Sequence, residues 1–330
     1  MLFMFPGQGS QKIGMGKDLY DAFSSARDVF REVDEAISFN LSDLIFFGSD
    51  DDLKLTENAQ PALMAASMAF VQAMKKDFSL DITEKARFFA GHSLGEYTAL
   101  CAAGVISLAD TARLLRTRGL AMASACRNDG SMAAIIGLEL EAVEKVLADI
   151  REDLKAEMSA KIFSGTDAAA PKTQDPVLQI ANDNSIGQVV ISGHKVAVEK
   201  AMTKFKESGA KMVRSLEVSG PFHCALMDAA VEALAKVMDS VVFNTPAKPI
   251  ISNVTAQAES VNLRQLLLQQ LVSRVKWRES MNFVAANSVT KAVEIGPGKV
   301  LTGLMKRIAP SLECQNINSL ESAEDFCKKK

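Results

Sequence analysis

The sequence is poor in the residues that bind metals or form disulfides. Its 330 residues include three histidines and five cysteines, and the cysteines are scattered without a C-x-x-C pair. With so few clustered ligands, we expect no metal site. An odd number of separated thiols is typical of reduced cysteines in the cytoplasm, which is where we expect the protein to be located.

The sequence also lacks an excess of positive charge and any long hydrophobic run. The formal net charge is −3, which provides no overall basic field for nucleic acid. No apolar run approaches the roughly 20 residues of a membrane-spanning helix. The apolar segment from Leu2 to Phe5 is too short for a signal-peptide core and has no basic lead-in, so we interpret it as a buried strand. We therefore expect neither a nucleic-acid partner nor a membrane partner.

The order of strand-like and helix-like segments predicts an α/β protein in two parts. Residues 1–127 begin with a buried strand and continue with helices, one of them over 60–76 with Pro61 in its first turn. Residues 128–218 follow the order β-α-β-β-α-β, which is the ferredoxin-like arrangement. Residues 219–330 return to the first pattern. We therefore predict an α/β core formed by the two outer segments, with a ferredoxin-like subdomain inserted between them.

The inserted subdomain contains one segment of unusual composition. A helix is predicted over 141–154, and residues 156–176 are then rich in Ala, Lys and Asp and contain two prolines. Such a composition favours a mobile surface excursion over a packed element.

The pentapeptide Gly91-His92-Ser93-Leu94-Gly95 has the pattern G-x-S-x-G. It lies between a predicted strand over 86–90 and a predicted helix that begins near Glu96. A sharp turn in this position lifts the serine hydroxyl clear of the sheet, and the glycines give the two segments room to pass. The helix N-terminus and the N–H that follows the serine then face a developing oxyanion. We predict that Ser93 is a nucleophile; the alternative is a tight turn with a capping serine.

A serine nucleophile needs a base, and only three histidines are available. His92 adjoins Ser93, and we expect its side chain to point away from the hydroxyl. His194 lies in a loop of the subdomain, where a solvated side chain is expected. His223 lies in a turn-rich link at which the chain re-enters the core, and a hinge between two parts is where a cleft should open. We predict that His223 is the base, with a buried structural histidine as the alternative.

The group that orients this histidine is not evident from spacing. Asp228 is a candidate by position, and a backbone carbonyl could do the same work through the imidazole Nδ1–H. Gly7-Gln8-Gly9 follows the first strand but lacks the third glycine of a dinucleotide-binding loop. At the carboxyl edge of a sheet, the Gln8 N–H could instead be a second oxyanion donor; the alternative is an ordinary loop.

Three arginines follow the nucleophile on a helix predicted from Leu108 to about Ala125. Arg113, Arg116 and Arg118 stand at i, i+3 and i+5 and so cannot all share one face. Most surface arginines are simply solvated. An arginine turned toward the cleft would hold a carboxylate through two hydrogen bonds, which would favour a dicarboxylic acyl group.

Taken together, these segments resemble the malonyl-CoA:acyl-carrier-protein transacylase family. The matching pieces occur in the order of the family and extend from about residue 2 to about residue 310. Their joint occurrence is far more specific than any one of them. The pieces are Phe5-Pro6-Gly7-Gln8-Gly9-Ser10-Gln11, Gln60-Pro61-Ala62-Leu63, Gly91-His92-Ser93-Leu94-Gly95-Glu96-Tyr97, Gly187-Gln188-Val189-Val190-Ile191-Ser192-Gly193, Gly220-Pro221-Phe222-His223 and Glu294-Ile295-Gly296-Pro297-Gly298.

The resemblance implies a fold and a catalytic pair. The fold is a hydrolase-like parallel-sheet core over 1–127 and 219–330, with the ferredoxin-like subdomain over 128–218 inserted. Ser93 would carry the malonyl group as an ester, and His223 would be the general base and then the general acid.

The resemblance also implies roles around this pair. The backbone N–H groups of Gln8 and Leu94 would form the oxyanion hole. Arg118 would pair with the malonyl carboxylate. Gln270 would orient the histidine through its backbone carbonyl. A bulky Phe222 would crowd an α-methyl branch and so disfavour methylmalonyl groups.

The implied reaction transfers malonyl from coenzyme A to the phosphopantetheine thiol of acyl carrier protein, for fatty-acid synthesis and without a cofactor. Because acyl carrier protein is acidic, local basic patches are expected to meet it. A serine hydrolase or acyl-thioesterase, a non-catalytic docking module, and the same transacylation in a polyketide pathway are the alternatives. The candidate basic residues are Arg274, Lys276, Arg278, Lys299, Lys306 and Arg307.

Overall fold

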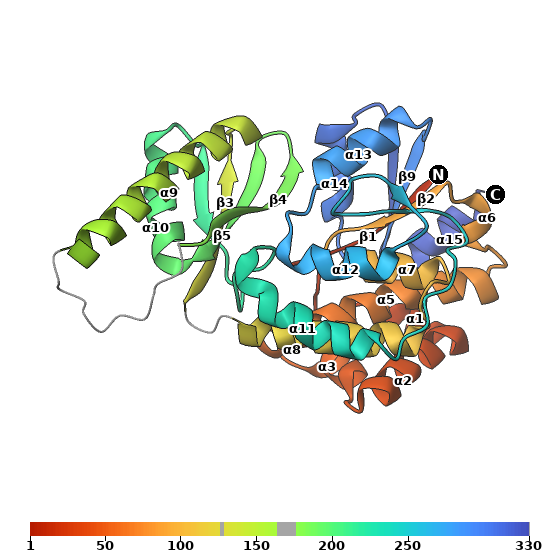
Figure 1. Ribbon diagram of the computed structural model, residues 1–330. Helices are drawn as coiled ribbons and strands as arrows, with labels where there is room; N and C mark the ends of the chain where they lie inside the picture. Colours follow the sequence, from red (N-terminus) through yellow and green to blue (C-terminus); the bar gives the residue numbers. More distant parts are fainter. Residues whose placement is uncertain (126–128, 164–175, 330) are drawn as a thin grey trace.

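The computed structural model describes residues 1–125, 129–163 and 176–329. It contains two β-sheets, one in each of two parts of the molecule that lie side by side (Figure 1). The large sheet has six strands in the order β10-β9-β1-β2-β7-β8. All neighbouring pairs are parallel except β7 and β8. The strands of this sheet are β1 (Leu2–Phe5), β2 (Phe88–Gly91), β7 (Ile250–Ile251), β8 (Ala258–Glu259), β9 (Lys291–Ile295) and β10 (Glu313–Ile317).

Both faces of the large sheet are covered by helices, which explains why β1 consists only of apolar residues. Alternate side chains of a strand point to opposite faces. Phe3 and Phe5 accordingly pack with α5, α7 and α8, whereas Leu2 and Met4 pack with α13 and α14. The helices around this sheet are α1 (Lys17–Ala22), α2 (Ser24–Ile37), α3 (Leu41–Phe47), α4 (Asp50–Lys54), α5 (Thr56–Lys76), α6 (Ile82–Lys85), α7 (Leu94–Ala102), α8 (Leu108–Ala125), α11 (Asp228–Met238), α12 (Leu263–Val272), α13 (Trp277–Ala286), α14 (Val300–Ile308) and α15 (Leu320–Lys328).

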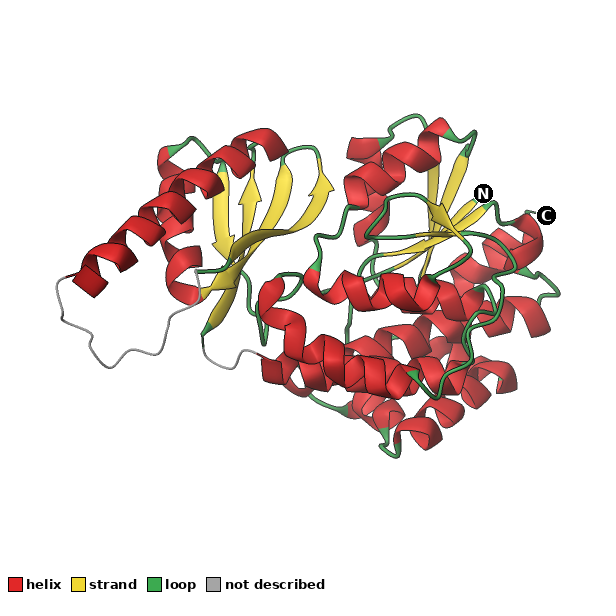
Figure 2. Cartoon of the chain, in the orientation of Figure 1, coloured by secondary structure: helices red, strands yellow, loops and turns green. Residues whose placement is uncertain are grey.

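The small sheet is antiparallel and has the strand order β4-β5-β3-β6. Figure 2 shows its two helices on the side away from the large sheet. These helices form a separate apolar cluster with one face of the small sheet. Met132, Ala181 and Val190 on the other face belong to the cluster of the large part. The elements are β3 (Gly130–Ile136), α9 (Leu140–Phe163), β4 (Leu178–Ser185), β5 (Gln188–His194), α10 (Lys195–Glu207) and β6 (Met212–Ser215).

The edge strand β4 joins the small sheet to the large part. Val275, just before α13, donates its N–H to Ala181 O at 2.8 Å and accepts from Asp183 N at 3.0 Å. The Asp183 carboxylate, which is 1% exposed, forms an ion pair with Arg278 of α13 at 2.9 Å. These contacts hold the two sheets in one arrangement and fix the walls of the cleft between them.

The structure is a mixed α/β protein with a mainly parallel sheet, as the sequence predicts, but several element boundaries differ. Helix α5 begins at Thr56, so Pro61 lies inside the helix and not in its first turn. Helix α9 continues to Phe163, into the segment interpreted as an excursion, and 164–175 lie outside the described residues. The last strand of the small sheet is short, Met212–Ser215. Strand β10 and helix α15 were not predicted.

Candidate active site

Ser93 occupies the turn between β2 and α7, at the carboxyl edge of the large sheet. Its backbone has φ 53° and ψ −110°, a conformation that is strained for any residue except glycine. The two glycines of the pentapeptide make this turn possible. A Cβ on Gly91 would lie 1.9 Å from the carbonyl of Gly95, and a Cβ on Gly95 would lie 2.3 Å from the carbonyl oxygen of Phe5. No larger residue fits at either position without displacing the backbone.

His223 lies against the nucleophile. Its Nε2 is 2.8 Å from Ser93 Oγ, and its Nδ1 is 2.9 Å from the backbone carbonyl oxygen of Gln270. Because a carbonyl only accepts, Nδ1 must carry the hydrogen and Nε2 is then free to accept from the serine hydroxyl. Asp228, the other candidate for the orienting group, is exposed at the start of α11. A helix-terminal carbonyl therefore occupies the place of the third member of a catalytic triad.

The protonation state of His223 follows from its surroundings. Burial, together with the positive charge of Arg118, lowers the pKa of His223 to about 3. The imidazole is therefore neutral near pH 7 and able to accept a proton, as a general base requires.

Arg118 brings a buried cation to the same point. It is 1% exposed, and its Nη2 donates to Ser93 Oγ and to Gln270 Oε1, both at 3.0 Å. Its Nη1 donates to Gln60 Oε1 at 2.7 Å. The Nε atom has no hydrogen-bond partner among the described residues. Burial lowers the pKa of Arg118, but a guanidinium remains charged near pH 7.

The other two arginines of α8 have structural partners. Arg113 forms an ion pair with Asp110 one turn away. Arg116 donates to the carbonyl oxygen of Glu57 at 3.0 Å. That carbonyl would accept from residue 61 in a regular helix, but Pro61 has no N–H to donate. Arg116 thus satisfies the acceptor that the proline leaves free in α5.

The remaining histidines lie outside the reacting pair. His92 points away from the hydroxyl, with Nε2 2.8 Å from Asn184 Oδ1 of the small sheet and its ring against Trp277. Burial lowers the pKa of His92. His194 accepts from the Val177 N–H through Nδ1 at 2.9 Å.

Gln8 and Leu94 line the same pocket as Ser93. Leu94 is the first residue of α7, where an N–H has no acceptor within its own helix. Gln8 lines the same pocket, and its side chain is held by a hydrogen bond from Thr56 Oγ1 at 2.8 Å. The N–H of Ser93 itself donates to Asn253 Oδ1 at 2.8 Å and is already engaged. The assignment of Gln8 and Leu94 as backbone donors to an oxyanion stays a prediction, with which their place in this pocket is consistent.

These groups line a pocket of about 280 Å³. Arg118, Ser93 and His223 are among its polar lining residues. Its apolar wall consists of Met122, Met132, Leu216, Val218 and Phe222.

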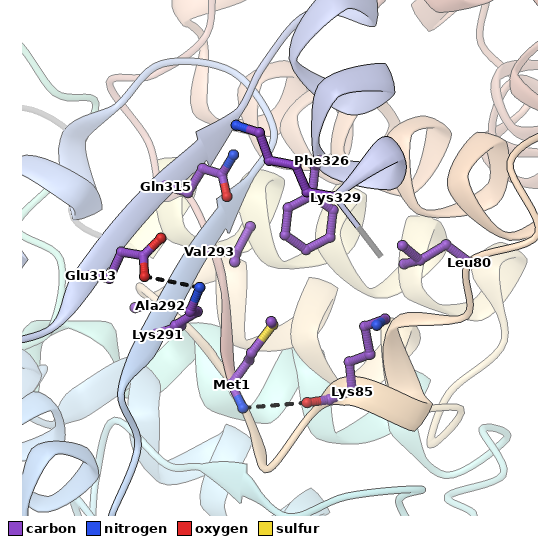
Figure 3. Close-up of a pocket in the computed structure, with 10 residues that line it drawn as sticks. All are labelled: Met1, Leu80, Lys85, Lys291, Ala292, Val293, Glu313, Gln315, Phe326 and Lys329. Carbon is purple, nitrogen blue, oxygen red and sulfur yellow. Dashed lines mark hydrogen bonds and ion pairs between the residues drawn. The ribbon is translucent and has the colours of Figure 1, made fainter.

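A second pocket lies at the opposite, amino edge of the large sheet (Figure 3). Lys291 forms an ion pair with Glu313 at 2.9 Å, and the Met1 amine donates to the backbone carbonyl oxygen of Lys85 at 3.3 Å. It contains neither a serine nor a histidine, so the chemistry is assigned to the carboxyl edge.

Comparisons with known proteins identify the family of this chain. The model of the acyl transferase domain matches residues 2–160. The chain is 42% identical to the malonyl CoA-acyl carrier protein transacylase of Bacillus subtilis, over 98% of this chain and 94% of that protein. It is 39% identical to the Escherichia coli K12 protein of the same name, over 96% and 95%. The chain belongs to the malonyl-CoA:acyl-carrier-protein transacylase family.

Solved structures of this family are closely similar. The acyl-carrier-protein-S-malonyltransferase of Bartonella henselae has a TM-score of 0.89 and 46% identity, and the match covers 99% of this chain and 98% of that one. A malonyl-transacylase, solved in complex with a type II PKS acyl-carrier protein, has a TM-score of 0.87 and 36% identity, and the match covers 100% of this chain and 99% of that one. The resemblance inferred from the motifs is thereby confirmed.

Sequence reasoning missed three buried polar residues of this transacylase site, namely Gln60, Glu96 and Asn253. Gln60 and Glu96 stand inside the quoted motifs, but no spacing rule assigns them a partner. Asn253 follows β7, the neighbour of β2, and the carboxyl-edge rule that drew attention to Gln8 could have found it.

The described part of the chain contains no helix long and apolar enough to cross a membrane. Within the same residues, no three His, Cys, Asp or Glu side chains are placed to share a metal ion.

Proposed function

We propose that this protein transfers the malonyl group of malonyl-CoA to the phosphopantetheine thiol of acyl carrier protein, through a malonyl-serine intermediate, and so supplies fatty-acid synthesis. Its membership of the transacylase family supports this function. The observation that carries it is the buried Arg118 guanidinium beside Ser93 Oγ. A cation in this place suits an acyl group that ends in a carboxylate.

The first half-reaction forms the acyl-enzyme. Ser93 Oγ attacks the thioester carbonyl while His223 Nε2 accepts the hydroxyl proton. The N–H groups of Gln8 and Leu94 stabilise the negative oxygen of the tetrahedral intermediate. When this intermediate collapses, the bond to sulfur breaks, and His223 returns the proton to the thiolate of coenzyme A. His223 is neutral again at the end of the step.

The second half-reaction uses the same groups in reverse. His223 takes the proton of the phosphopantetheine thiol, and the sulfur attacks the ester carbonyl of malonyl-Ser93. Collapse of the second intermediate returns the proton to Ser93 Oγ. Throughout, Arg118 would hold the malonyl carboxylate, and the Phe222 ring at the pocket wall would crowd an α-methyl branch. No step needs a metal or a prosthetic group.

We also propose a division of the chain into two domains. We assign residues 1–127 and 219–330 to a hydrolase-like core and 128–218 to an inserted ferredoxin-like subdomain. The connection of a strand-turn-helix nucleophile to a mainly parallel sheet supports the first assignment. The order β3-α9-β4-β5-α10-β6 supports the second. A cytoplasmic location is proposed on the pattern of cysteines.

The acidic carrier protein would need an accessible basic surface. Arg274 pairs with Glu279 and Glu144, and Arg278 pairs with Asp183, so neither is a free cation. The exposed basic residues of α14 and its N-cap are better suited to an acidic partner. They are Lys299, Lys306 and Arg307.

Intact mass spectrometry tests the proposal. The protein and a Ser93→Ala variant are mixed briefly with malonyl-CoA, and holo acyl carrier protein is then added. We expect a malonyl adduct on wild-type protein only, which moves to the carrier thiol. An adduct lost to water with or without the carrier would instead establish a hydrolase or thioesterase. The polyketide variant has the same chemistry, and comparing transfer rates to fatty-acid and polyketide carriers separates the two.

A further inference from the structure

Glu96 is a buried carboxylate next to the site that the mechanism above does not use. It is 2% exposed and lies on α7, three residues after the nucleophile. Its Oε2 accepts two hydrogen bonds, from Gln270 Nε2 at 2.7 Å and from the backbone N–H of Asn253 at 3.1 Å. Each of these two residues in turn contacts the reacting groups.

The first connection runs through Gln270. Its backbone carbonyl accepts from His223 Nδ1, and its Oε1 accepts from Arg118. Its Nε2 also lies 3.1 Å from Ser93 O. Since a carboxylate only accepts, Glu96 fixes which end of the amide is the donor. If the amide were reversed, its NH₂ group would meet the Arg118 guanidinium and Arg118 would lose an acceptor.

The second connection runs through Asn253. Its Oδ1 accepts from Ser93 N at 2.8 Å, and its Nδ2 donates to Gly91 O at 2.8 Å. One side chain therefore ties the two sides of the strained nucleophile turn together. Asn253 is itself held at its backbone by Glu96, so both connections start from the same carboxylate oxygen.

Burial of the Glu96 carboxylate costs folding free energy, and this cost indicates that the residue has a role. Burial raises the pKa of Glu96 to about 7, against the hydrogen bonds from Gln270, Asn253 and Ser252 and the nearby charge of Arg118. An apolar residue at this position of α7 would avoid that desolvation. The Asn253 N–H would, however, then lose its acceptor, and Gln270 Nε2 would keep only its longer hydrogen bonds to Ser93 O and Asn253 Oδ1.

We propose that Glu96 is a positioning residue, whose Oε2 holds Gln270 and Asn253 and through them fixes the His223 ring, the Arg118 guanidinium and the Ser93 turn before substrate arrives. This role rests on the proposed transacylation for its kinetic consequence. The geometry itself is independent of the substrate.

Two substitutions separate this role from general stability. Glu96→Gln keeps an oxygen that can accept both hydrogen bonds, whereas Glu96→Leu removes the acceptor at similar size. Glu294 supplies a matched control, because it is also a fully buried glutamate that accepts backbone hydrogen bonds, from Leu301 and Thr302 at the start of α14. Glu294→Leu should destabilise the fold in a comparable way without reaching Ser93, and it is compared at the loading step alone, because α14 also carries the basic residues proposed to meet the carrier protein.

Three measurements are made on each variant, namely kcat/KM for the loading of Ser93 from malonyl-CoA before carrier protein is added, the rate at which a fluorophosphonate probe labels Ser93, and the thermal unfolding midpoint. For Glu96→Leu we expect kcat/KM to fall about 100-fold, as for the loss of hydrogen bonds to a charged group. Labelling should fall by a smaller factor, because it needs the Ser93 and His223 pair but not the carboxylate contact of Arg118. Glu96→Gln should retain both rates within about threefold.

The proposal is overturned if Glu96→Leu lowers the unfolding midpoint but keeps both rates, or if Glu96→Gln is as impaired as Glu96→Leu. It is also overturned if Glu294→Leu loses activity to the same extent at equal loss of stability. Should Glu96→Leu fail to fold, Glu96→Asp takes its place: the carboxylate is kept one methylene short of its partners, and both rates must fall. If wild-type protein does not transfer malonyl, the proposed function fails, and the labelling rates still test Glu96.

Discussion

Arg118 Nη2 lies 3.0 Å from Ser93 Oγ, so the buried cation and the nucleophile are in direct hydrogen-bond contact. This contact gives Arg118 two effects. Its charge favours the partly ionised serine oxygen during attack and helps to keep His223 neutral. It also places a guanidinium within reach of the far carboxylate of any malonyl group esterified to Ser93. Under the proposed function, selection of the acyl group and activation of the nucleophile would therefore share one side chain.

Replacing Arg118 with alanine should reduce malonyl loading more than loading of an uncharged acyl group. A lost charge-assisted contact to the carboxylate predicts a fall in kcat/KM for malonyl-CoA of about 100-fold or more. Acetyl-CoA lacks the carboxylate and should be affected less. The ratio of the two rates is measured by intact mass. Arg113→Ala, in which an exposed arginine of the same helix is removed, is the control and should leave the ratio unchanged. An unchanged ratio in Arg118→Ala would exclude the carboxylate contact.

The rate of acylation should not fall near pH 6.5, as it would if the base were a histidine with an ordinary pKa. Burial and Arg118 lower the pKa of His223 to about 3, so the free enzyme holds a neutral base throughout the range from pH 5 to 8. Single-turnover malonyl loading should therefore show no loss of rate with a midpoint near 6.5 as the pH falls. If the loading rate does fall with a midpoint near pH 6.5, and still does so in Glu96→Gln, then His223 titrates normally and is less buried during turnover than in this structure.

Asn253 holds the nucleophile turn, so its removal should lower kcat. Asn253→Ala leaves the Ser93 N–H and the Gly91 carbonyl without their partners, while Ser93 stays at φ 53°. We expect kcat to fall about tenfold and the unfolding midpoint to drop. Asn287→Ala removes a local hydrogen bond to Phe283 O at the end of α13 and serves as the control for stability. Equal kcat values for the two variants would contradict a role of Asn253 at the turn.

The parts of the site that the sequence predicts are those with a local signal. Ser93 lies in a pattern of five residues, and His223 follows from there being only three histidines to consider. The spacing of the three arginines shows that they differ in direction, but the direction of Arg116 depends on Pro61 in another helix. Glu96, Asn253 and Gln270 meet only because three loops and helix ends converge at one edge of the sheet. Glu96 is 157 residues from Asn253 and 174 from Gln270, and no periodicity along the chain records such contacts.

The buried Glu96 should also make the stability of the protein depend on pH in a recognisable direction. Burial raises the pKa of Glu96 from 4.5 to about 7, so the folded state binds this proton more tightly than the unfolded state does. Its contribution to stability is therefore fully present below about pH 4.5 and is lost as the pH rises through 7. Glu96→Gln has no such proton. Relative to wild type, this variant should gain up to about 3 kcal/mol in the free energy of unfolding between pH 5 and pH 8. His223 acts in the opposite direction, since its lowered pKa costs stability as the pH falls below 6.5, but it is common to both proteins and cancels in the comparison. Urea unfolding at the two pH values measures the difference. If wild type and Glu96→Gln differ in unfolding free energy by the same amount at pH 5 and at pH 8, Glu96 titrates as an ordinary carboxylate.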